Sequence, residues 1–443
     1  MSALVLAALL AASPPLSVDL EQVRARSREN TQALTALLQV STVEQDVRLS
    51  RSSLLPQLNL SAGASLDING AQRNIILVPV PGGTSTRQPL DVEASTNQGY
   101  SLGLNLTQLI YDRAVWARLE QSGAQLEGQR GQALEQRDAS ELEGVLRFLS
   151  LVRTQATIAV LEANVRRSEQ QLERAQALFQ AGRLAKADEL AARVNLGNDR
   201  ITVTTQQAQL ATDQILLATW LALPGAEPLV AVDPGLLQQK PVPPVSLEQA
   251  LEEARAHRPL LAALRQQLRA ARLQEVIAHA GYLPRVSFQA QYSRIGNDVG
   301  VVFAQPQLQN SLNLGIGVSW NLFGGLSTQA QQRRAEFQSR VAELNLQQNE
   351  RELEGAVRQA HAAVMAQIAA TELAEANRQA AAEALANAEG RFGAGLLSTL
   401  EVRDAQLKLT QAELSLLQNR IEVERARFAL MRAMGTLSPG ETK

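Results

Sequence analysis

Proline is missing from two long stretches of this 443-residue chain, residues 90–223 and 307–438. Proline removes a backbone hydrogen-bond donor and clashes with the preceding helical turn, so its absence allows helices of unusual length. The good helix formers alanine, glutamine, leucine, glutamate and arginine dominate residues 112–178 and 326–389. At a rise of ~1.5 Å per residue, each helix would be on the order of 100 Å long. Helices of this length do not fit inside an ordinary globular domain and predict lateral packing of helix against helix.

The two stretches belong to copies of one pattern. Leu54-Leu55-Pro56-Gln57-Leu58 returns as Tyr282-Leu283-Pro284-Arg285-Val286, and Phe179-Gln180-Ala181-Gly182 returns as Phe392-Gly393-Ala394-Gly395. This duplication predicts two structural repeats, 17–223 and 246–443, joined by a proline-rich linker at 224–245. Each repeat should contain a helix, a β-hairpin, a very long helix, a tight turn and a returning helix. The first repeat has extra residues, and its proline and glycine residues between 69 and 97 predict a longer loop there.

The β-hairpins are expected at 57–69/99–107 and 285–293/312–322, the long helices at 113–178 and 325–390, and the hairpin tips at 179–188 and 391–401. In the strands every second residue is apolar, whereas Ser, Gly, Asn, Gln and Thr predominate between them. A period of two places these two sets on opposite faces of a sheet. The apolar face is expected to contact lipid through Leu58, Leu60, Leu102, Leu104, Phe288, Tyr292, Val318 and Trp320.

A half-buried sheet of a soluble protein shows the same alternation, so it remains an alternative. Two features favour a membrane. The polar face lacks the Lys and Glu mixture of a solvent-exposed sheet, and the strands approach the ~9 to 11 residues that a tilted membrane strand needs. Most aromatic residues also lie within or beside strands, as at a membrane interface, although strand propensity enriches aromatic residues too.

Four strands cannot close a barrel, and open strand edges are not tolerated in lipid. The chain is therefore expected to oligomerise, and two copies would supply eight strands whereas three would supply twelve. The polar inner wall then implies a water-filled pore. A helix that continues from a barrel strand would continue the wall as a tube; a free coiled-coil rod is the alternative.

The amino-acid composition argues against several other classes of function. The 42 Lys and Arg against 44 Asp and Glu leave a net charge of -2, which argues against nucleic acid as a partner. With no cysteine there is no thiolate metal site and no lipid-modified N-terminal cysteine. His257, His279 and His361 lack metal-ligand spacing, so we expect no metal, no cofactor and no enzymatic activity. Residues 1–16 carry a short apolar run and then Ser13-Pro14-Pro15, which predicts a signal peptide.

Several motifs recur in duplicate and in one order. The first strand of each repeat opens with Leu55-Pro56-Gln57-Leu58 and with Leu283-Pro284-Arg285-Val286. The strand-to-helix junctions carry Leu109-Ile110-Tyr111-Asp112 and Asn321-Leu322-Phe323-Gly324-Gly325. The first helix of repeat 2 contains Arg258-Pro259. At the tips, Phe179, Gly182 and Asp188 have the same spacing as Phe392, Gly395 and Glu401. In these motifs the chain resembles the TolC-like outer-membrane factor family of Gram-negative bacteria, over nearly all of its length after residue 17.

The resemblance implies a homotrimer in the outer membrane, mainly α with a transmembrane β part. Its twelve-stranded β-barrel would continue as a twelve-helix α-barrel through the periplasm. A periplasmic adaptor would dock at the hairpin tips, and an inner-membrane pump of resistance-nodulation-division, ABC or major facilitator type would supply the energy. The protein would serve efflux or type I secretion as a passive conduit. Which substrate passes, drug, metal ion or protein, is not encoded in these motifs.

The resemblance also assigns roles at the tips. Leu400-Glu401-Val402-Arg403-Asp404-Ala405 matches the family pattern Val-Asp-Val-Leu-Asp-Ala, so Glu401, Asp404 and the first-repeat counterpart Asp188 are expected to form acidic rings at the periplasmic aperture. Such rings would favour cations. The residues expected to dock the adaptor are Phe179, Gly182, Leu184, Phe392, Gly395 and Leu396.

Simpler explanations exist for these tip residues. Gly182 and Gly395 would also serve as helix C-caps, and Asp188 and Glu401 would interact favourably with the start of a helix whatever the pore requires. The sequence departs from the family where Phe392 and Leu397 replace a tyrosine and an arginine, which argues against a gate built on those two side chains. A soluble periplasmic scaffold or adaptor without a pore is the competing class of function.

Overall fold

The computed structural model describes residues 16–223, 229–232, 235, 237–305, 310–394 and 396–438. Residues 1–15 of the expected signal peptide and part of the proline-rich linker therefore lie outside the described residues. The chain divides into two compact units. Unit 1 comprises residues 1–42, 127–266 and 343–443, and unit 2 comprises residues 43–126 and 267–342. The long helices contribute residues to both units, and each unit is described separately.

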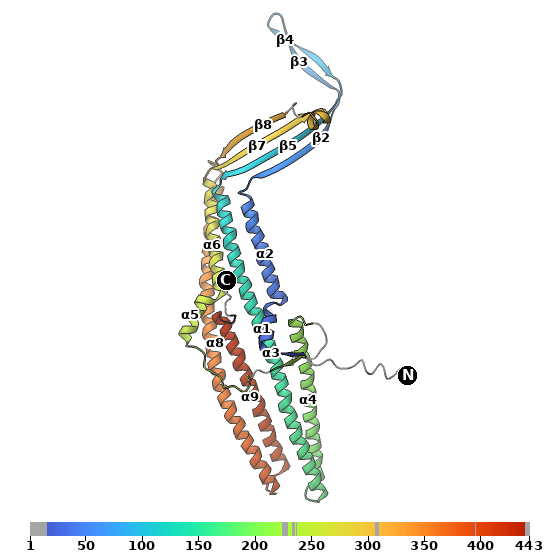
Figure 1. Ribbon diagram of the computed structural model, residues 1–443, viewed down its shortest axis with the longest axis vertical. Helices are drawn as coiled ribbons and strands as arrows, with labels where there is room; N and C mark the ends of the chain where they lie inside the picture. The colour runs from blue at the N-terminus through green and yellow to red at the C-terminus, as the bar shows by residue number, and fades with distance from the viewer. Residues whose placement is uncertain are drawn as a thin grey trace, which may run out of the picture. The chain divides into compact units, whose positions relative to one another are not determined.

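Unit 2 contains a four-stranded antiparallel sheet that joins the hairpins of the two repeats (Figure 1). The repeats meet where β5 pairs with β7, so β2 and β8 form the edges. Neither edge strand has a second partner among the described residues. In spatial order the strands are β2 (Gln57–Asn69), β5 (Ser95–Tyr111), β7 (Arg285–Gly296) and β8 (Asn310–Ser319).

The strand register places the predicted lipid-facing residues together. Leu60 lies opposite Leu104, Leu104 opposite Tyr292, and Val286 opposite Val318. Residues directly opposite one another point to the same side of a sheet. One face of the sheet therefore carries Leu58, Leu60, Leu102, Leu104, Phe288, Tyr292 and Val318.

The predicted strand at 312–322 is wrong at its end, and so is the placement of Trp320 in a strand. β8 stops at Ser319 because Ser319 pairs with Arg285, the first residue of β7, and the residue before Arg285 is Pro284, which has no amide hydrogen to extend the ladder. Trp320 follows the strand directly and donates a hydrogen bond from its indole nitrogen to the carbonyl of Tyr282, at 3.0 Å.

The longer loop expected at 69–97 is instead a second hairpin, β3 (Gln72–Val80) and β4 (Thr84–Val92). The apolar run Ile75-Ile76-Leu77-Val78 suits a strand, and Gly82 and Gly83 take the positive φ angles of +127° and +89° that a tight turn requires. Proline and glycine at this turn dominated the sequence-based prediction. A further short helix, α7 (Val299–Phe303), follows β7 and was not predicted.

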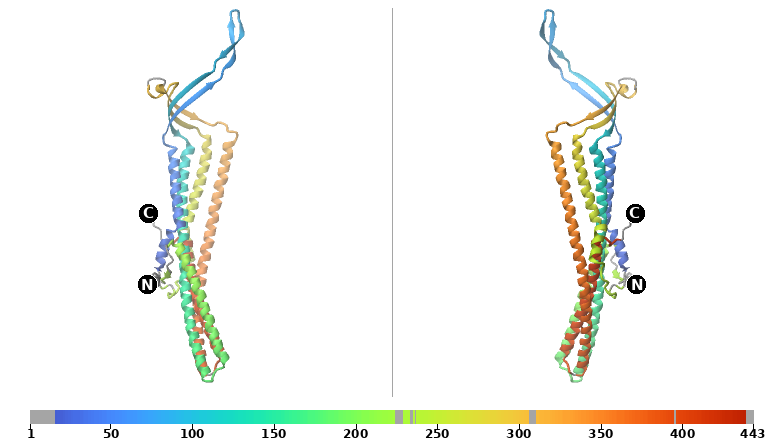
Figure 2. Two further views of the ribbon diagram at one scale, coloured as in Figure 1. Left: turned by 90° about the vertical axis from the view of Figure 1, so that its right-hand side faces the viewer. Right: turned by 90° about the vertical axis from the view of Figure 1, so that its left-hand side faces the viewer.

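Unit 1 is built on two helical hairpins whose turns lie at the same end of the unit (Figure 2). The first hairpin pairs α3 (Arg113–Gln180) with α4 (Lys186–Trp220), and the second pairs α8 (Ser327–Gly393) with α9 (Thr399–Met434). Among the described residues only α3 contains a segment apolar enough for a membrane span, and half of that segment is buried within the chain, as in the core helix of a soluble domain.

The first helix of each repeat is broken in two, where a single helix was expected. Repeat 1 has α1 (Leu20–Arg28) and α2 (Thr31–Ser52), and repeat 2 has α5 (Leu247–His257) and α6 (Pro259–His279). Asn30 starts α2 by accepting a hydrogen bond from the backbone amide of Ala33 at 2.9 Å. Pro259 starts α6, and Arg258 before it is extended, as residues before proline prefer.

A parallel pair of short strands completes unit 1, β1 (Leu16–Val18) and β6 (Leu229–Ala231). It links the start of repeat 1 to the segment after α4, and it was not predicted from the sequence. The pair covers an apolar core that α1, α3, α4 and α9 share, in which the largest fully buried side chains include Phe148, Leu149, Leu217, Leu229 and Ile421.

Candidate functional site

The tip of the first hairpin is a helix end closed by glycine. Gly182 has a left-handed φ of +70°, its amide donates to the carbonyl of Phe179 at 2.9 Å, and the amide of Arg183 donates to the carbonyl of Leu178 at 2.8 Å. These two bonds satisfy carbonyls that the helix end would leave free. Gly182 therefore has the capping role.

Asp188 lies in the first turn of α4 and contacts the other hairpin. One of its carboxylate oxygens accepts a hydrogen bond from the hydroxyl of Thr399, the first residue of α9, at 3.0 Å. The side chain of Asp188 is half-buried. This predicted ring residue thus joins the tips of the two hairpins within one chain.

Glu401 caps its own helix. Its carboxylate accepts hydrogen bonds from the backbone amide of Ser398 at 3.0 Å and from the Ser398 hydroxyl at 2.8 Å. The Ser398 hydroxyl oxygen in turn accepts a hydrogen bond from the amide of Glu401 at 3.4 Å, which completes a capping box. These bonds from the backbone and side chain of Ser398 lower the pKa of Glu401 below its usual value, so the group stays ionised. Asp404 is exposed and pairs with Lys408 at 2.7 Å, one turn further along α9.

The residues predicted to dock an adaptor differ in exposure. Leu396 is 70% exposed, whereas Phe392 packs against the small apolar cluster of the second hairpin. The Phe179 ring lies under the ammonium of Lys186, 4.8 Å from its centroid, and Leu184 is half-buried. Gly395 lies outside the described residues.

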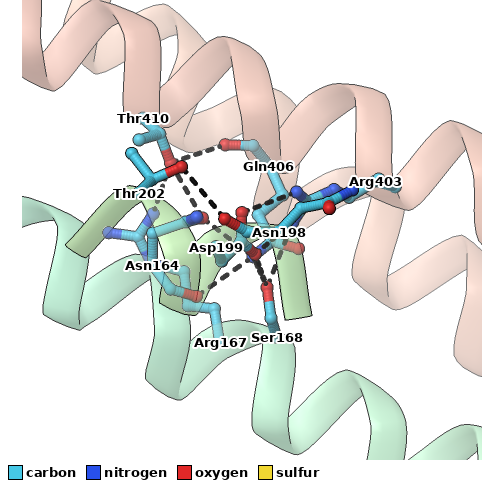
Figure 3. A network of polar contacts seen from close by, with 9 residues as sticks. All are labelled: Asn164, Arg167, Ser168, Asn198, Asp199, Thr202, Arg403, Gln406 and Thr410. Carbon is cyan, nitrogen blue, oxygen red and sulfur yellow. Dashed lines mark hydrogen bonds and ion pairs between the residues drawn. The ribbon is translucent and has the colours of Figure 1, made fainter. Parts of the chain in front are cut away.

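A buried ion pair joins the two hairpins close to their tips (Figure 3). The guanidinium of Arg403 on α9 donates to both carboxylate oxygens of Asp199 on α4, at 2.8 and 2.9 Å. Ser168 on α3 donates to the same carboxylate at 2.6 Å and accepts from Arg403 at 3.0 Å. The side chains of Arg403 and Asp199 are only 13% and 9% exposed. Because both charges are buried, they depend on each other for compensation.

Neutral hydrogen bonds continue this ion pair along α9. Gln406 donates to Asn164 at 3.0 Å and to Ser168 at 2.9 Å, and Thr410 donates to Asn164 at 3.0 Å. All four of these side chains are buried. We call Asn164, Ser168, Asp199, Arg403, Gln406 and Thr410 the inter-hairpin network.

A cleft of about 330 Å³ lies between the inter-hairpin network and the Asp188–Thr399 contact. It is bounded by Ala191 and Ala192 on α4 and by Leu400 on α9. The two hairpins are therefore held by polar contacts on both sides of a space that small alanine side chains leave open.

Sequence reasoning missed the inter-hairpin network. One signal was present, because Arg403 stands where the resembling family has leucine, and a charge there needs a partner. Asp199 follows the buried Leu196 by three residues on α4 and so falls on its inward face. The pairing itself required the structure, since the two partners lie 204 positions apart in the chain.

A second buried polar cluster lies in unit 1 where α1, α3 and the end of the chain meet. Although burial opposes it, hydrogen bonds from Arg28, Ser438 and Arg24 lower the pKa of the fully buried Glu141. Burial raises the pKa of nearby Asp138 to about 6, and the negative charges of Glu135 and Glu141 act in the same direction. Asp138 therefore titrates near neutral pH.

The described residues contain no group of three or more His, Asp or Glu side chains that could hold a metal ion. His361 hydrogen-bonds to the carbonyl of Val245 at 3.0 Å, a structural contact. Two features therefore characterise the described residues. One is a sheet with an apolar face, a polar face and unpaired edges, and the other is a pair of helical hairpins joined by polar contacts near their tips.

Comparison of the whole sequence with protein families decides between a channel and a soluble scaffold. The sequence model described as outer membrane efflux protein matches residues 23–223 and 250–436, most of both repeats. The chain belongs to the outer membrane efflux protein family. This efflux protein is 24% identical to the outer membrane protein TolC of Vibrio cholerae over 428 residues, which cover 95% of this chain and 91% of TolC.

Solved structures agree on the fold of the efflux protein. CusC superposes with a TM-score of 0.79 at 19% identity, covering 94% of this chain and 92% of CusC. The CmeC outer membrane channel of Campylobacter jejuni superposes with a TM-score of 0.74 at 16% identity, covering 94% of this chain and 86% of CmeC. The predicted fold class, with a transmembrane β-barrel continued by an α-barrel, is confirmed, and so is the prediction of an outer-membrane channel.

Proposed function

We propose that three copies of this efflux protein form one channel, with four strands and four hairpin helices from each copy. The unpaired edges of β2 and β8 support this arrangement, because open strand edges are not tolerated in lipid and four strands cannot close a barrel. In the trimer, β8 of one protomer pairs with β2 of the next. The face with Leu60, Leu104 and Tyr292 contacts lipid, and the opposite face, with Asn59, Asn105 and Gln291, lines the lumen.

The hairpin tips form the periplasmic entrance of the channel in this proposal, and the inter-hairpin network holds the entrance closed. The observation that carries this step is the buried Arg403–Asp199 pair, which ties α9 to α4 at two oxygens. Such a pair can separate without leaving a buried unpaired charge, because separation of the hairpins exposes both charged groups to water. When the entrance opens, the Arg403–Asp199 ion pair is therefore replaced by hydration of both charged groups.

A periplasmic adaptor supplies the work for this exchange by docking at the tips. The exposed Leu396 and Leu400, 70% and 75% exposed, offer apolar contact area beside the acidic Glu401 and Asp404. An inner-membrane pump coupled to the adaptor delivers the substrate. Asp188, Glu401 and Asp404 contribute three copies each to the entrance, and Asp188 is the one already engaged across the hairpins.

Planar-bilayer recordings of the detergent-extracted protein test this function. Discrete conductance steps are expected from the native chain. Leu104→Arg should abolish membrane assembly because it places a charge in lipid, whereas Asn105→Arg, its neighbour on the lumen face, should assemble. Equal assembly of the two variants would show that the faces are assigned wrongly. A native protein that is soluble without detergent and gives no conductance would refute the channel.

A further inference from the structure

A polar cleft of about 660 Å³ lies in unit 2, where the sheet meets its helices. Its walls come from α3, α6 and α8 and from the first residue of β7 and the last residue of β8. The volume is within the range of ~300 to 1,000 Å³ that is typical of sites for small molecules. None of the functions proposed above uses this cleft.

The strand register shows on which face of the sheet the cleft opens. Arg285 and Ser319 line the cleft and are register partners. The next pair along the strands, Val286 and Val318, lies on the apolar face. Since successive residues of a strand point to opposite faces, Arg285 and Ser319 belong to the polar face. If the channel is built as proposed, that face lines the lumen.

The exposed charged side chains that line the cleft are all basic. Three guanidinium groups line it, those of Arg118, Arg285 and Arg334, and all three residues are exposed. No hydrogen bond or ion pair to any of the three is found among the described residues. Among the described residues that line the cleft, the only acidic one is Asp112, which is 7% exposed and accepts a hydrogen bond from the amide of Ala114 at 2.8 Å as the N-cap of α3.

We propose that this arginine cleft is an anion-binding site on the lumen wall, which takes phosphate or carboxylate groups of solutes in transit. A guanidinium group presents hydrogen-bond donors in a planar arrangement that matches the oxygens of a phosphate or a carboxylate. Three unpaired guanidinium groups around one cavity give the site its preference for multivalent anions. The inference rests on the proposed function, because only a trimeric channel makes this face a lumen. In that trimer, nine arginines form a positive belt.

Inorganic triphosphate is the probe, added to single channels in phosphatidylcholine bilayers. It should block the native current, and the variant Arg118→Gln/Arg285→Gln/Arg334→Gln should lose on the order of tenfold in apparent affinity, since a cleft of one charge sign concentrates counter-ions by at least that factor. Arg333→Gln is the matched control, because Arg333 neighbours Arg334 on α8 but does not line the cleft. The control should keep native block.

The salt concentration and the lipid separate the remaining outcomes. Raising KCl from about 0.15 M to about 1 M should weaken the block, because the Debye length falls from about 8 Å to about 3 Å. If phosphatidylglycerol in the bilayer competes with triphosphate, lipid headgroups supply the anion, and if it does not, solutes do. Equal block in the triple variant and the native protein would refute the site. Absence of any conductance would refute the channel instead.

Discussion

Arg403→Leu is the sharpest test of the inter-hairpin network. It leaves the Asp199 carboxylate, 9% exposed, without its cation and with Ser168 as its remaining donor. Removing one partner of a buried pair costs about 3–5 kcal/mol because an uncompensated charge stays buried. Arg403→Leu/Asp199→Leu removes both charges, and apolar replacement of both partners is often neutral in other proteins. The double variant should therefore recover most of the loss.

Arg200→Leu is the matched control. Arg200 follows Asp199 directly and pairs with Glu169 on α3 at 2.7 Å, but this pair is 62% and 45% exposed. An exposed pair contributes about 0–1 kcal/mol. Arg200→Leu should therefore change little, although it removes the same type of charge directly beside Asp199.

The assay combines two measurements on the purified trimer. Hydrogen exchange of the amides in residues 399–410 should become faster in Arg403→Leu, and single-channel recordings should show longer open times. Both changes should largely disappear in the double variant and be absent in Arg200→Leu. Indistinguishable exchange and open times in Arg403→Leu and Arg200→Leu would refute the reasoning that the buried pair holds the hairpins together.

Three further predictions concern single sites. Asp138→Asn should raise the free energy of unfolding at pH 7 by about 1–3 kcal/mol and change it little at pH 4. The reason is that the pKa of Asp138 is about 6 in the folded chain, so the native protein loses stability as the pH rises from 3.8 through 6. Chemical denaturation at both pH values measures this difference, and an equal effect at the two values would contradict it. Gly182→Ala should destabilise the first tip by about 1–2 kcal/mol, because alanine is strained at a φ of +70°, and thermal melting beside Gly197→Ala, a helical position with open space, tests it. Glu401→Gln/Asp404→Asn should reduce the cation preference measured by reversal potential in a KCl gradient, and an unchanged preference would place the constriction elsewhere.

The sequence predicted what depends on period and composition. The alternation from Gln57 to Asn69 located a strand correctly because apolar and polar residues alternate along it, so the sequence marks both of its faces. The two Pro-free stretches predicted α3 and α8 to within a few residues of their ends. The turn at Gly182 was visible because glycine is favoured where φ is positive.

What the sequence did not predict depends on partners distant in the chain. The parallel pair of β1 and β6 has three residues a side, too few for a periodic pattern. The β3–β4 hairpin was read as a loop because local proline and glycine signals outweighed a short apolar run. The sequence did not predict that Arg403 pairs with Asp199. Helix periodicity places each residue on one face of its own helix, but it does not show which other helix packs against that face.

The duplication has a consequence for the symmetry of the tube. The spacing that relates Phe179 to Phe392 also relates Leu190 to Arg403, Ser168 to Ala381 and Asp199 to Ala412. The second repeat therefore lacks the residues to build the same ion pair in the reverse direction. In the proposed trimer, the contacts between hairpins within a protomer contain this ion pair and those between protomers do not, so the tip has threefold and not sixfold symmetry. We expect the seams between protomers to part first, and paired cysteines placed across each kind of seam would distinguish the two in this cysteine-free chain.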